Sequence, residues 1–513
     1  MSRARASRLI PILAAVLGAA LAVTACAPEP VAGWQPREWA DSGRVVDTPV
    51  AAEPGQAPVF DLRLRNDDVG IDARWATLPG ASDFNAAVEN VVRQAVQAQA
   101  TASGQAYRPQ AHPVGAGLAE RGCTPGSTTA SIDEVLGDRK GTVVVCEIVL
   151  ARGSVLGERL RMITAQPDGS VTDTATTVYT DIDTGAVATG ADLFTDPAAL
   201  WPAYIEALRR DVGSLSLLPV AEPTDAQLEV FLDALDHADL VDGELLIPVP
   251  ADLSARELDG LAGWRERSPQ HPLSVALDAS RASESLSPLA QTIAAADGVF
   301  TGQASAGAGA EHVPCDLVPC MAMTLDDGPS DLTPQFLDVL RDQHSAATFF
   351  MLGQNAQSFP DTVRRVAAEG HEIANHTWNH PYLTQLTRAD IESQLGRTAA
   401  LLRELSGQPV KMFRPPGGFV DANVVAIAAQ PAILWSVDTR DWAHPADGDL
   451  TRYAIETPDV STILLMHDIQ AGSARVFGDV VAGLRDRGLT LVTVSALFGG
   501  VVPGGVVRHG PLS

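Results

Sequence analysis

The sequence predicts an α/β fold, with a parallel sheet and interleaved helices in the C-terminal part and a separate α+β domain before it. After residue 311, short apolar runs alternate with helical patterns, as in parallel strands joined by crossover helices. About seven such units close or nearly close a barrel. Before residue 296, predicted strands are followed by predicted helices, which is typical of an α+β domain. A chain of 513 residues also exceeds the length that one core supports.

Elements of the N-terminal domain are expected within residues 59–295. Alternating apolar residues predict strands, and amphipathic patterns predict helices. Strands are expected at Thr142–Leu150, Leu160–Ala165 and Thr174–Asp183, and helices at Pro197–Leu208 and Ala226–Leu235.

A linker is expected at residues 296–311, because residues 301–310 are almost entirely Gly, Ala, Ser and Gln. The C-terminal domain is expected at 312–500, with a tail at 501–513. Its strands are expected at Met321–Thr324, Ala347–Met351, Glu372–Ala374, Lys411–Phe413, Ile433–Ser436, Thr462–Met466 and Leu489–Val492. Its helices are expected at Thr333–Arg341, Asp361–Glu369, Arg388–Leu405 and Phe477–Arg487.

The first residues have the layout of a secretory signal peptide, expected at residues 1–25. Basic residues precede the apolar stretch Leu9–Val23, and small residues lead to Cys26. The run Val23–Cys26 resembles a bacterial lipobox, which implies a lipid on Cys26 and a position on the outer face of the cytoplasmic membrane, facing the cell wall. An uncleaved membrane anchor and a plain secretory peptide are the alternatives. Residues 26–58, rich in Pro, Ala and Gly, are expected to be a tether.

The net charge indicates which partners the protein can bind, and the number of cysteines indicates the compartment in which it works. With 63 acidic and 36 basic residues, the net charge of -27 repels phosphate backbones and argues against nucleic acid as a partner. Apart from Cys26, the even number of cysteines suits an oxidising compartment. The natural disulfide pairs are sequence neighbours, Cys123 with Cys146 and Cys315 with Cys320, and free buried thiols are the alternative.

Polar clusters follow the predicted strands of the C-terminal domain. If those strands are parallel, the side chains gather at one end of one sheet. Taken alone, each cluster has an ordinary structural explanation, such as a solvated acidic turn or a surface ion pair. The clustered residues are Asp326, Asp327, His376, His380, Arg414, Asp441 and His467.

The first clusters provide the groups for a metal site and a base. Asp327, His376 and His380 form the carboxylate and imidazole set that binds a divalent metal and leaves positions open for water and substrate. Asp326, the adjacent carboxylate, is the candidate general base. Arg414 is expected to hold Asp326 in position and keep it ionised.

The later clusters provide an acid and a substrate pocket. His467 is the candidate general acid, because an amine leaving group must be protonated. Asp441 is expected to orient His467 and raise its pKa. The backbone N–H of Gly417 is a candidate oxyanion donor, and Trp442 with Leu465 could wall a small pocket that suits a methyl group.

The polar residues fall into five short clusters, which are Asp326–Pro329, His376–His380, Arg414–Gly417, Asp438–Trp442 and His467–Asp468. In this order, the five clusters resemble the NodB-type polysaccharide deacetylases, carbohydrate esterase family four, over about residues 312–500. The resemblance implies a distorted (β/α) barrel, a divalent metal that is usually Zn²⁺ although Co²⁺ or another ion can serve, and removal of N-acetyl groups from glycans. The resemblance also implies the roles described above for the metal ligands, the general base, the general acid, their supporting residues and the residues that contact the substrate. Two positions depart from the family pattern: Leu325 stands where an aromatic residue is usual, and Gly417 stands where Tyr is frequent.

A second resemblance covers part of the N-terminal domain. Residues 178–185, 191–194 and 245–250 resemble the RsiV-like extracytoplasmic domain that accompanies some peptidoglycan deacetylases. The resemblance implies an accessory domain over residues 59–295.

The expected function is that of an exported, membrane-anchored, metal-dependent hydrolase that removes N-acetyl groups from cell-wall glycan and releases acetate. Its polysaccharide substrate would be the N-acetylglucosamine or the N-acetylmuramic acid of peptidoglycan. The alternatives are an O-acetyl esterase on xylan-type polysaccharide, a catalytically inactive glycan-binding or sensing lipoprotein, and a non-haem iron oxygenase with the same metal ligands.

Overall fold

The computed structural model describes residues 43–47, 56–166, 168–211, 219–250, 253–258, 273–280, 282–303 and 307–511. The expected signal peptide and Cys26 lie outside these residues. Residues from Ser42 to Ser513 group into one compact unit, so the expected separation of an N-terminal domain is not confirmed. Within the described part of the chain, no helix has the length and apolar character needed to cross a membrane.

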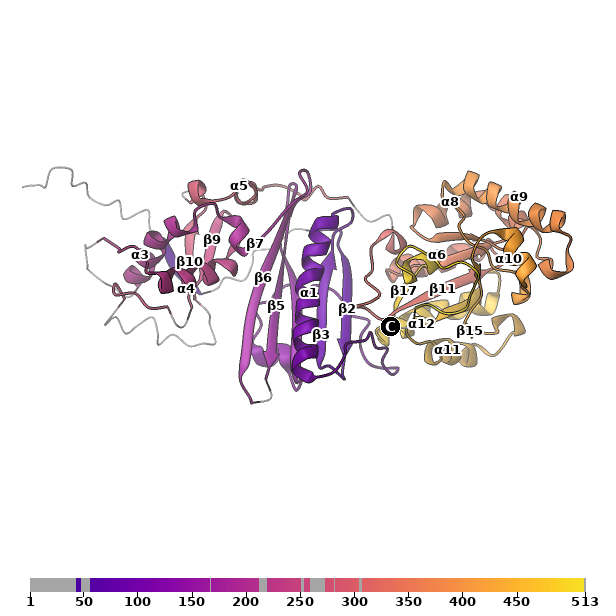
Figure 1. Cartoon of the computed structure of the whole chain (residues 1–513), viewed down its shortest axis with the longest axis horizontal. Helices are drawn as coiled ribbons and strands as arrows, with labels where there is room; N and C mark the ends of the chain where they lie inside the picture. The colour runs from indigo at the N-terminus through magenta and orange to yellow at the C-terminus, as the bar shows by residue number, and fades with distance from the viewer. Residues whose placement is uncertain are drawn as a thin grey trace, which may run out of the picture. The chain divides into compact units, whose positions relative to one another are not determined.

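A six-stranded sheet forms the first part of the described chain. Its order is β2-β3-β4-β5-β6-β7, antiparallel except between β3 and β4. Helix α1 lies across one face (Figure 1) and buries Phe84, Val88 and Val92 at helical spacing, although the sequence patterns did not predict it. The elements are β2 (Phe60–Asn66), β3 (Ile71–Thr77), α1 (Ser82–Ser103), α2 (Ile132–Leu136), β4 (Gly141–Arg152), β5 (Val155–Ala165), β6 (Val171–Asp181) and β7 (Ala186–Thr189).

A four-stranded antiparallel sheet has the order β1-β10-β9-β8. Strand β1 lies inside the range expected to be a tether, and its residue Arg44 pairs with Ala276. Trp201, Tyr204 and Phe231 bury their rings in the core of this part. The elements are β1 (Arg44–Asp47), α3 (Trp201–Asp211), α4 (Asp225–Asp236), β8 (Asp239–Val241), β9 (Glu244–Pro248), β10 (Leu273–Asp278) and α5 (Pro288–Ala294).

A parallel sheet forms the C-terminal part, as the alternation of apolar runs and helices predicts. Its order is β13-β12-β11-β16-β15, and β17 also pairs with β11. A short pair, β14 with β18, continues beyond Phe413, which bridges to Asn375 and Ala432. The strands are β11 (Cys320–Asp326), β12 (Thr348–Met351), β13 (Glu372–Asn375), β14 (Ala432–Ile433), β15 (Val437–Asp438), β16 (Ile463–His467), β17 (Thr490–Val492) and β18 (Val506–Val507).

A closed barrel is not formed by the ladders of the described residues, because β14 and β15 do not pair with each other. The strand expected at Lys411–Phe413 is reduced to isolated bridges at Phe413, and β14 ends at Ile433 instead of Ser436. The carbonyl groups of Ile433 and Leu434 accept hydrogen bonds from the Arg414 side chain. The carbonyl groups here thus bind a buried cation, while the N–H groups of the same two residues donate to the carbonyls of Phe413 and Val507.

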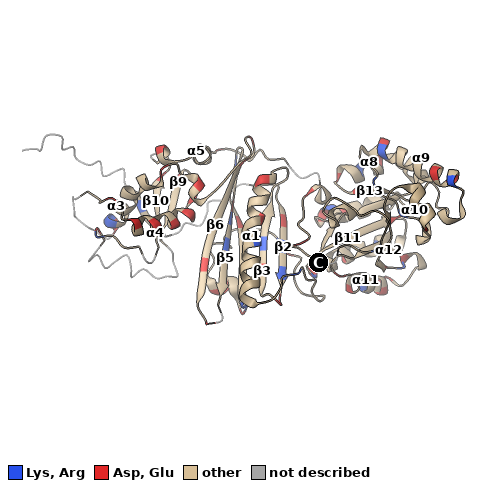
Figure 2. Ribbon diagram, viewed as in Figure 1, with Lys and Arg blue, Asp and Glu red and all other residues tan. Residues whose placement is uncertain are grey.

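Helices flank the parallel sheet (Figure 1), and the rings of Phe336 in α6 and Phe477 in α12 pack with centroids 4.6 Å apart. Both α8 and α9 carry basic and acidic positions (Figure 2). Arg365 of α8 pairs with Glu369, which directly follows the helix, and Arg388 pairs with Glu392 on α9. The helices are α6 (Thr333–Asp342), α7 (Gly353–Ser358), α8 (Pro360–Ala368), α9 (Arg388–Ser406), α10 (Ala422–Ala428), α11 (Asp447–Glu456), α12 (Ala471–Asp486) and α13 (Val494–Leu497).

Strand β11 is the centre of this sheet, and all its residues are buried. Successive side chains of a strand point to opposite faces, so Met321, Met323 and Leu325 join the core beneath the helices. Thr324 and Asp326 therefore share the other face. This alternation sets the direction in which the first carboxylate of the cluster points.

Candidate active site

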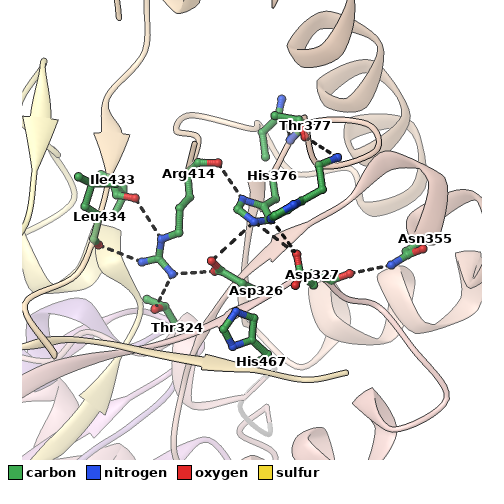
Figure 3. Close-up of polar contacts among 12 residues, drawn as sticks. Thr324, Asp326, Asp327, Asn355, His376, Thr377, Arg414, Ile433, Leu434 and His467 are labelled. Carbon is green, nitrogen blue, oxygen red and sulfur yellow. Dashed lines mark hydrogen bonds and ion pairs between the residues drawn. The ribbon is translucent and has the colours of Figure 1, made fainter. Parts of the chain in front are cut away.

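The last residues of three strands of the parallel sheet carry polar groups at or beside the site. Asp326 ends β11, His467 ends β16, and Asn375 ends β13 immediately before His376. The register of the parallel ladder places Asp326 opposite His467. Because the strands are parallel, their carboxyl ends meet at one edge, and all seven clustered side chains predicted from the sequence belong to segments at that edge. Figure 3 shows Asp326, Asp327, His376, Arg414 and His467 among them.

Asp327, His376 and His380 come together in the geometry of a metal-binding group. Oδ1 of Asp327 lies 3.5 Å from Nε2 of His376 and 3.6 Å from Nε2 of His380. The ligand atoms of the three residues all lie within 4.8 Å of one another. Oδ1 of Asp327 is buried and has no hydrogen-bond donor among the described residues. A buried carboxylate oxygen between two imidazole nitrogens suits a divalent cation.

The orientation of His376 is set by its second nitrogen. Nδ1 lies 2.8 Å from the carbonyl oxygen of Arg414, so Nδ1–H donates to this carbonyl and Nε2 faces Asp327 (Figure 3). This contact between a backbone carbonyl and a histidine is common around metal ligands and fixes the ring tautomer. Burial lowers the pKa of His376, but the nearby Asp326 and Asp327 carboxylates outweigh it and raise the pKa.

The two histidines lie on a loop and not on a helical turn. Thr377 and His380 have φ angles of 71° and 65°, and Asp327 has a φ of 72°. Non-glycine residues in this left-handed region are strained, and such strain gathers at functional sites. The loop is held by hydrogen bonds from the backbone of Thr377 to Asn375 Oδ1 at 2.9 Å and from the backbone of Trp378 to Gln394 Oε1 at 2.8 Å.

Arg414 is completely buried and binds the face of β11 that carries Asp326. Its Nη1 donates to Asp326 Oδ1 at 2.7 Å and to Thr324 Oγ1 at 2.9 Å. Its Nε donates to the carbonyl of Ile433 and its Nη2 to the carbonyl of Leu434, each at 3.0 Å (Figure 3). Oδ1 of Asp326 is therefore hydrogen-bonded to Arg414, whereas Oδ2 lies 3.7 Å from Nε2 of His376.

His467 is bonded to Asp441 through both its backbone and its ring. Its Nδ1 lies 2.7 Å from Asp441 Oδ1, and its backbone N–H donates to Asp441 Oδ2 at 2.8 Å. Burial lowers the pKa of His467, but the bond to Asp441 outweighs it and raises the pKa to about 9. Burial also opposes ionisation of Asp441, yet its bond to His467 lowers the pKa of this carboxyl. A protonated imidazole paired with a carboxylate can donate a proton from Nε2.

The three residues expected to contact substrate differ in exposure. Gly417 is exposed and has a φ of 64° within a short 3₁₀ turn, Pro416–Gly418. Trp442 is 52% exposed, whereas Leu465 is 3% exposed and lies in β16. Leu465 and Trp442 belong to segments next to His467 and Asp441.

Sequence reasoning assigned no role to three residues that support this edge of the sheet. Thr324 could have been found from its position two residues before Asp326 on the same strand face. Ser473, whose Oγ donates to Asp441 Oδ2, has no sequence signal. Asp468 is completely buried, accepts a hydrogen bond from Thr333 Oγ1 at 2.5 Å, and burial raises its pKa to about 7.

The cysteines other than Cys26 are bonded as sequence neighbours. Cys123 bonds to Cys146 with an S–S distance of 1.99 Å, and Cys315 bonds to Cys320 at 2.07 Å. Cys123 and Cys146 lie near Glu158, but sulfur atoms shared in a disulfide are not thiolate ligands for a metal. Cys320 is the first residue of β11, so the second bond fixes the start of the central strand.

Comparisons with known proteins identify one family. The family described as "Polysaccharide deacetylase" matches residues 315–433. A peptidoglycan-N-acetylglucosamine deacetylase of Bacillus cereus (strain ATCC 14579) is 34% identical over 186 residues, which cover 35% of this chain and 68% of the relative. The peptidoglycan-N-acetylmuramic acid deacetylase PdaC of Bacillus subtilis (strain 168) is 34% identical over 178 residues, which cover 34% of this chain and 38% of PdaC.

Among solved structures, one named "T48 deacetylase with substrate" is 38% identical and has a TM-score of 0.37, covering 38% of this chain and 100% of its own. The match to PdaC spans less than half of that protein. The Bacillus cereus enzyme is matched over more than two thirds of its length and aligns with about a third of this chain. The chain therefore belongs to the polysaccharide deacetylase family.

Proposed function

We propose that this protein is a metal-dependent hydrolase that removes N-acetyl groups from cell-wall glycan and releases acetate. The observation that carries the proposal is the arrangement of the Asp327, His376 and His380 group between two proton-transfer groups, Asp326 and the His467–Asp441 pair. The relatives named above are peptidoglycan deacetylases, which supports peptidoglycan as the substrate.

Asp327, His376 and His380 would hold the divalent cation. A cation at this place supplies Lewis-acid polarisation of the acetamide carbonyl and of a water molecule. Asp326 is the general base in this proposal. Because Arg414 occupies Oδ1 of Asp326, Oδ2 is the oxygen that accepts the proton of the attacking water.

His467 completes the reaction as the general acid. Breaking the C–N bond of the tetrahedral intermediate releases an amine, which must receive a proton as it leaves. The pKa of His467, raised to about 9, keeps the imidazole protonated at neutral pH. Asp441 keeps the ring oriented with Nδ1 toward its carboxylate, so that Nε2 carries the proton that is transferred.

The acetyl group is proposed to lie between Gly417 on one side and Trp442 with Leu465 on the other. The backbone N–H of Gly417, which is an exposed residue, would stabilise the oxyanion. The apolar surfaces of Trp442 and Leu465 would contact the methyl group.

Acetate release tests this function. Purified protein is incubated with peptidoglycan or chito-oligosaccharides in the presence of Zn²⁺ or Co²⁺, next to the Asp326→Asn variant. Wild-type protein should release acetate, and the variant should lose this activity by at least about a hundredfold. Wild-type protein that binds metal and frees no acetate from any of these glycans contradicts the proposal.

Zinc is the proposed metal, because two imidazoles and one carboxylate form a common zinc ligand set. Elemental analysis of protein purified without added metal tests this choice against cobalt, iron and other divalent ions.

We also propose that the protein is exported and held by a lipid on Cys26, with residues 59–295 as an accessory domain on the outer face of the membrane. The leader-like first residues and the two disulfides support export. Cell fractionation tests the anchor: the wild-type chain should be found in the membrane fraction, and a Cys26→Ser variant should not carry the lipid.

A further inference from the structure

Two exposed aromatic side chains meet beside Gly417. The ring centroids of Tyr382 and Phe419 lie 4.8 Å apart, with an angle of 55° between the ring planes. Tyr382 is 44% exposed and Phe419 is 52% exposed. Exposed apolar surface of this kind, formed by rings from two different loops, is typical of a surface that contacts a ligand.

Both rings lie close to the position that a Cβ atom of residue 417 would occupy. A Cβ atom at this position would lie 3.0 Å from Cδ2 of Phe419 and 3.1 Å from Cε1 of Tyr382. The positive φ of Gly417 would also strain any other residue there. The absence of a side chain at position 417 therefore leaves room for both rings beside this residue.

The two loops that carry the rings also carry the metal-binding group and its support. Tyr382 follows His380 by two residues, and Phe419 lies five residues after Arg414. The contact of 2.8 Å between His376 Nδ1 and the Arg414 carbonyl ties the two loops together. The aromatic pair thus comes from the same two loops that carry His380 and Arg414.

We propose that Tyr382 and Phe419 form a stacking surface for one pyranose ring of the glycan chain, next to the sugar whose acetamide is cleaved. The inference rests on the proposed function. A pyranose ring presents a face of C–H groups, and two tilted rings provide an apolar surface on the scale of one sugar. Because the pair adjoins Gly417, a sugar bound there extends the same glycan that places its acetyl group at this N–H.

Binding by an inactive variant tests the surface directly. In the Asp326→Asn background, Tyr382→Ala and Phe419→Ala should each weaken the binding of a chitopentaose by about tenfold, measured by calorimetry. Tyr382→Phe keeps the ring and should bind like its parent. Tyr453→Ala is the matched control, because Tyr453 is 45% exposed on α11, and it should leave binding unchanged.

Kinetics of the otherwise wild-type chain provide a second readout. Each alanine variant should lose about tenfold in kcat/KM for chitopentaose and less than about twofold for 4-nitrophenyl acetate, which has no sugar. Equal loss on both substrates, or unchanged affinity for chitopentaose in both alanine variants, overturns the stacking surface and leaves the proposed function standing. A wild-type chain that deacetylates no glycan overturns both.

Discussion

Asp326 and His467 face each other across the parallel ladder between β11 and β16. Each is the last residue of its strand, so their positions are set by backbone register and not by the conformation of a loop. The two groups also have separate supports, Arg414 for Asp326 and Asp441 for His467. A variant that alters one support should therefore affect one proton transfer more than the other.

Replacing His467 should separate amide cleavage from ester cleavage. An amine leaves only when it is protonated, whereas a nitrophenolate leaves without protonation. His467→Ala should lower kcat for an N-acetylated chito-oligosaccharide by about 10²–10⁴ and that for 4-nitrophenyl acetate by less than about tenfold. Steady-state kinetics on both substrates measure the difference. Equal losses would indicate that His467 does not act as the acid.

Replacing Asp441 should move the alkaline limit of activity. The general acid is active only while His467 is protonated, so activity falls as the pH rises through its pKa of about 9. Asp441→Asn removes the carboxylate that raises this pKa, which should fall toward the usual value of about 6.5. The alkaline limb of kcat against pH should then move to lower pH by at least about one unit.

The matched control for this shift is Ser473→Ala. Ser473 donates a hydrogen bond to Asp441 Oδ2, and its loss leaves the carboxylate charged. Its alkaline limb should move much less than that of Asp441→Asn. An unchanged limb in both variants argues that another group sets the alkaline limit.

Much of this site could be predicted because it lies at strand ends. The apolar run Met321–Thr324 predicts a buried strand, and the strand β11 indeed continues to Asp326. Once the strands are parallel, the polar residues after each run must gather at one edge. The loop from His376 to His380 then has only to reverse direction so that both imidazole rings face Asp327.

Contacts between distant segments could not be predicted from local patterns. The Arg414 side chain donates hydrogen bonds to the carbonyls of Ile433 and Leu434, at the point where β14 ends instead of continuing to Ser436. Helix α1 was missed because its apolar positions are diluted by Ala and Gln, and only packing on the sheet makes them a core face. The aromatic pair at Tyr382 and Phe419 likewise depends on two loops meeting.

Removing one metal ligand should abolish metal binding without unfolding the chain. Asp327→Asn keeps the shape of the side chain but removes the charge between the two imidazoles. Metal content per chain, measured by elemental analysis after dialysis, should fall by at least about tenfold, and activity should fall with it. His312→Ala is the control, because the His312 side chain is 69% exposed, and this variant should keep its metal. A fully loaded Asp327→Asn variant would place the metal elsewhere.

Replacing Arg414 should destabilise the chain through Asp326. Arg414→Met leaves a carboxylate that is 3% exposed without its partner, and an uncompensated buried charge costs about 3–5 kcal/mol. The free energy of unfolding, measured with urea by fluorescence, should fall by about this amount. In the double variant Asp326→Asn with Arg414→Met, no unpaired charge remains. It should therefore be more stable than Arg414→Met alone, although it is inactive.

The matched control for the charge argument is Arg388→Met. Arg388 pairs with Glu392 on α9, and their side chains are 64% and 55% exposed. Solvent screens an exposed pair, so this substitution should change the free energy of unfolding by less than about 1 kcal/mol. If the double variant is no more stable than Arg414→Met, the loss comes from the packing and carbonyl contacts of the guanidinium and not from the charge left on Asp326.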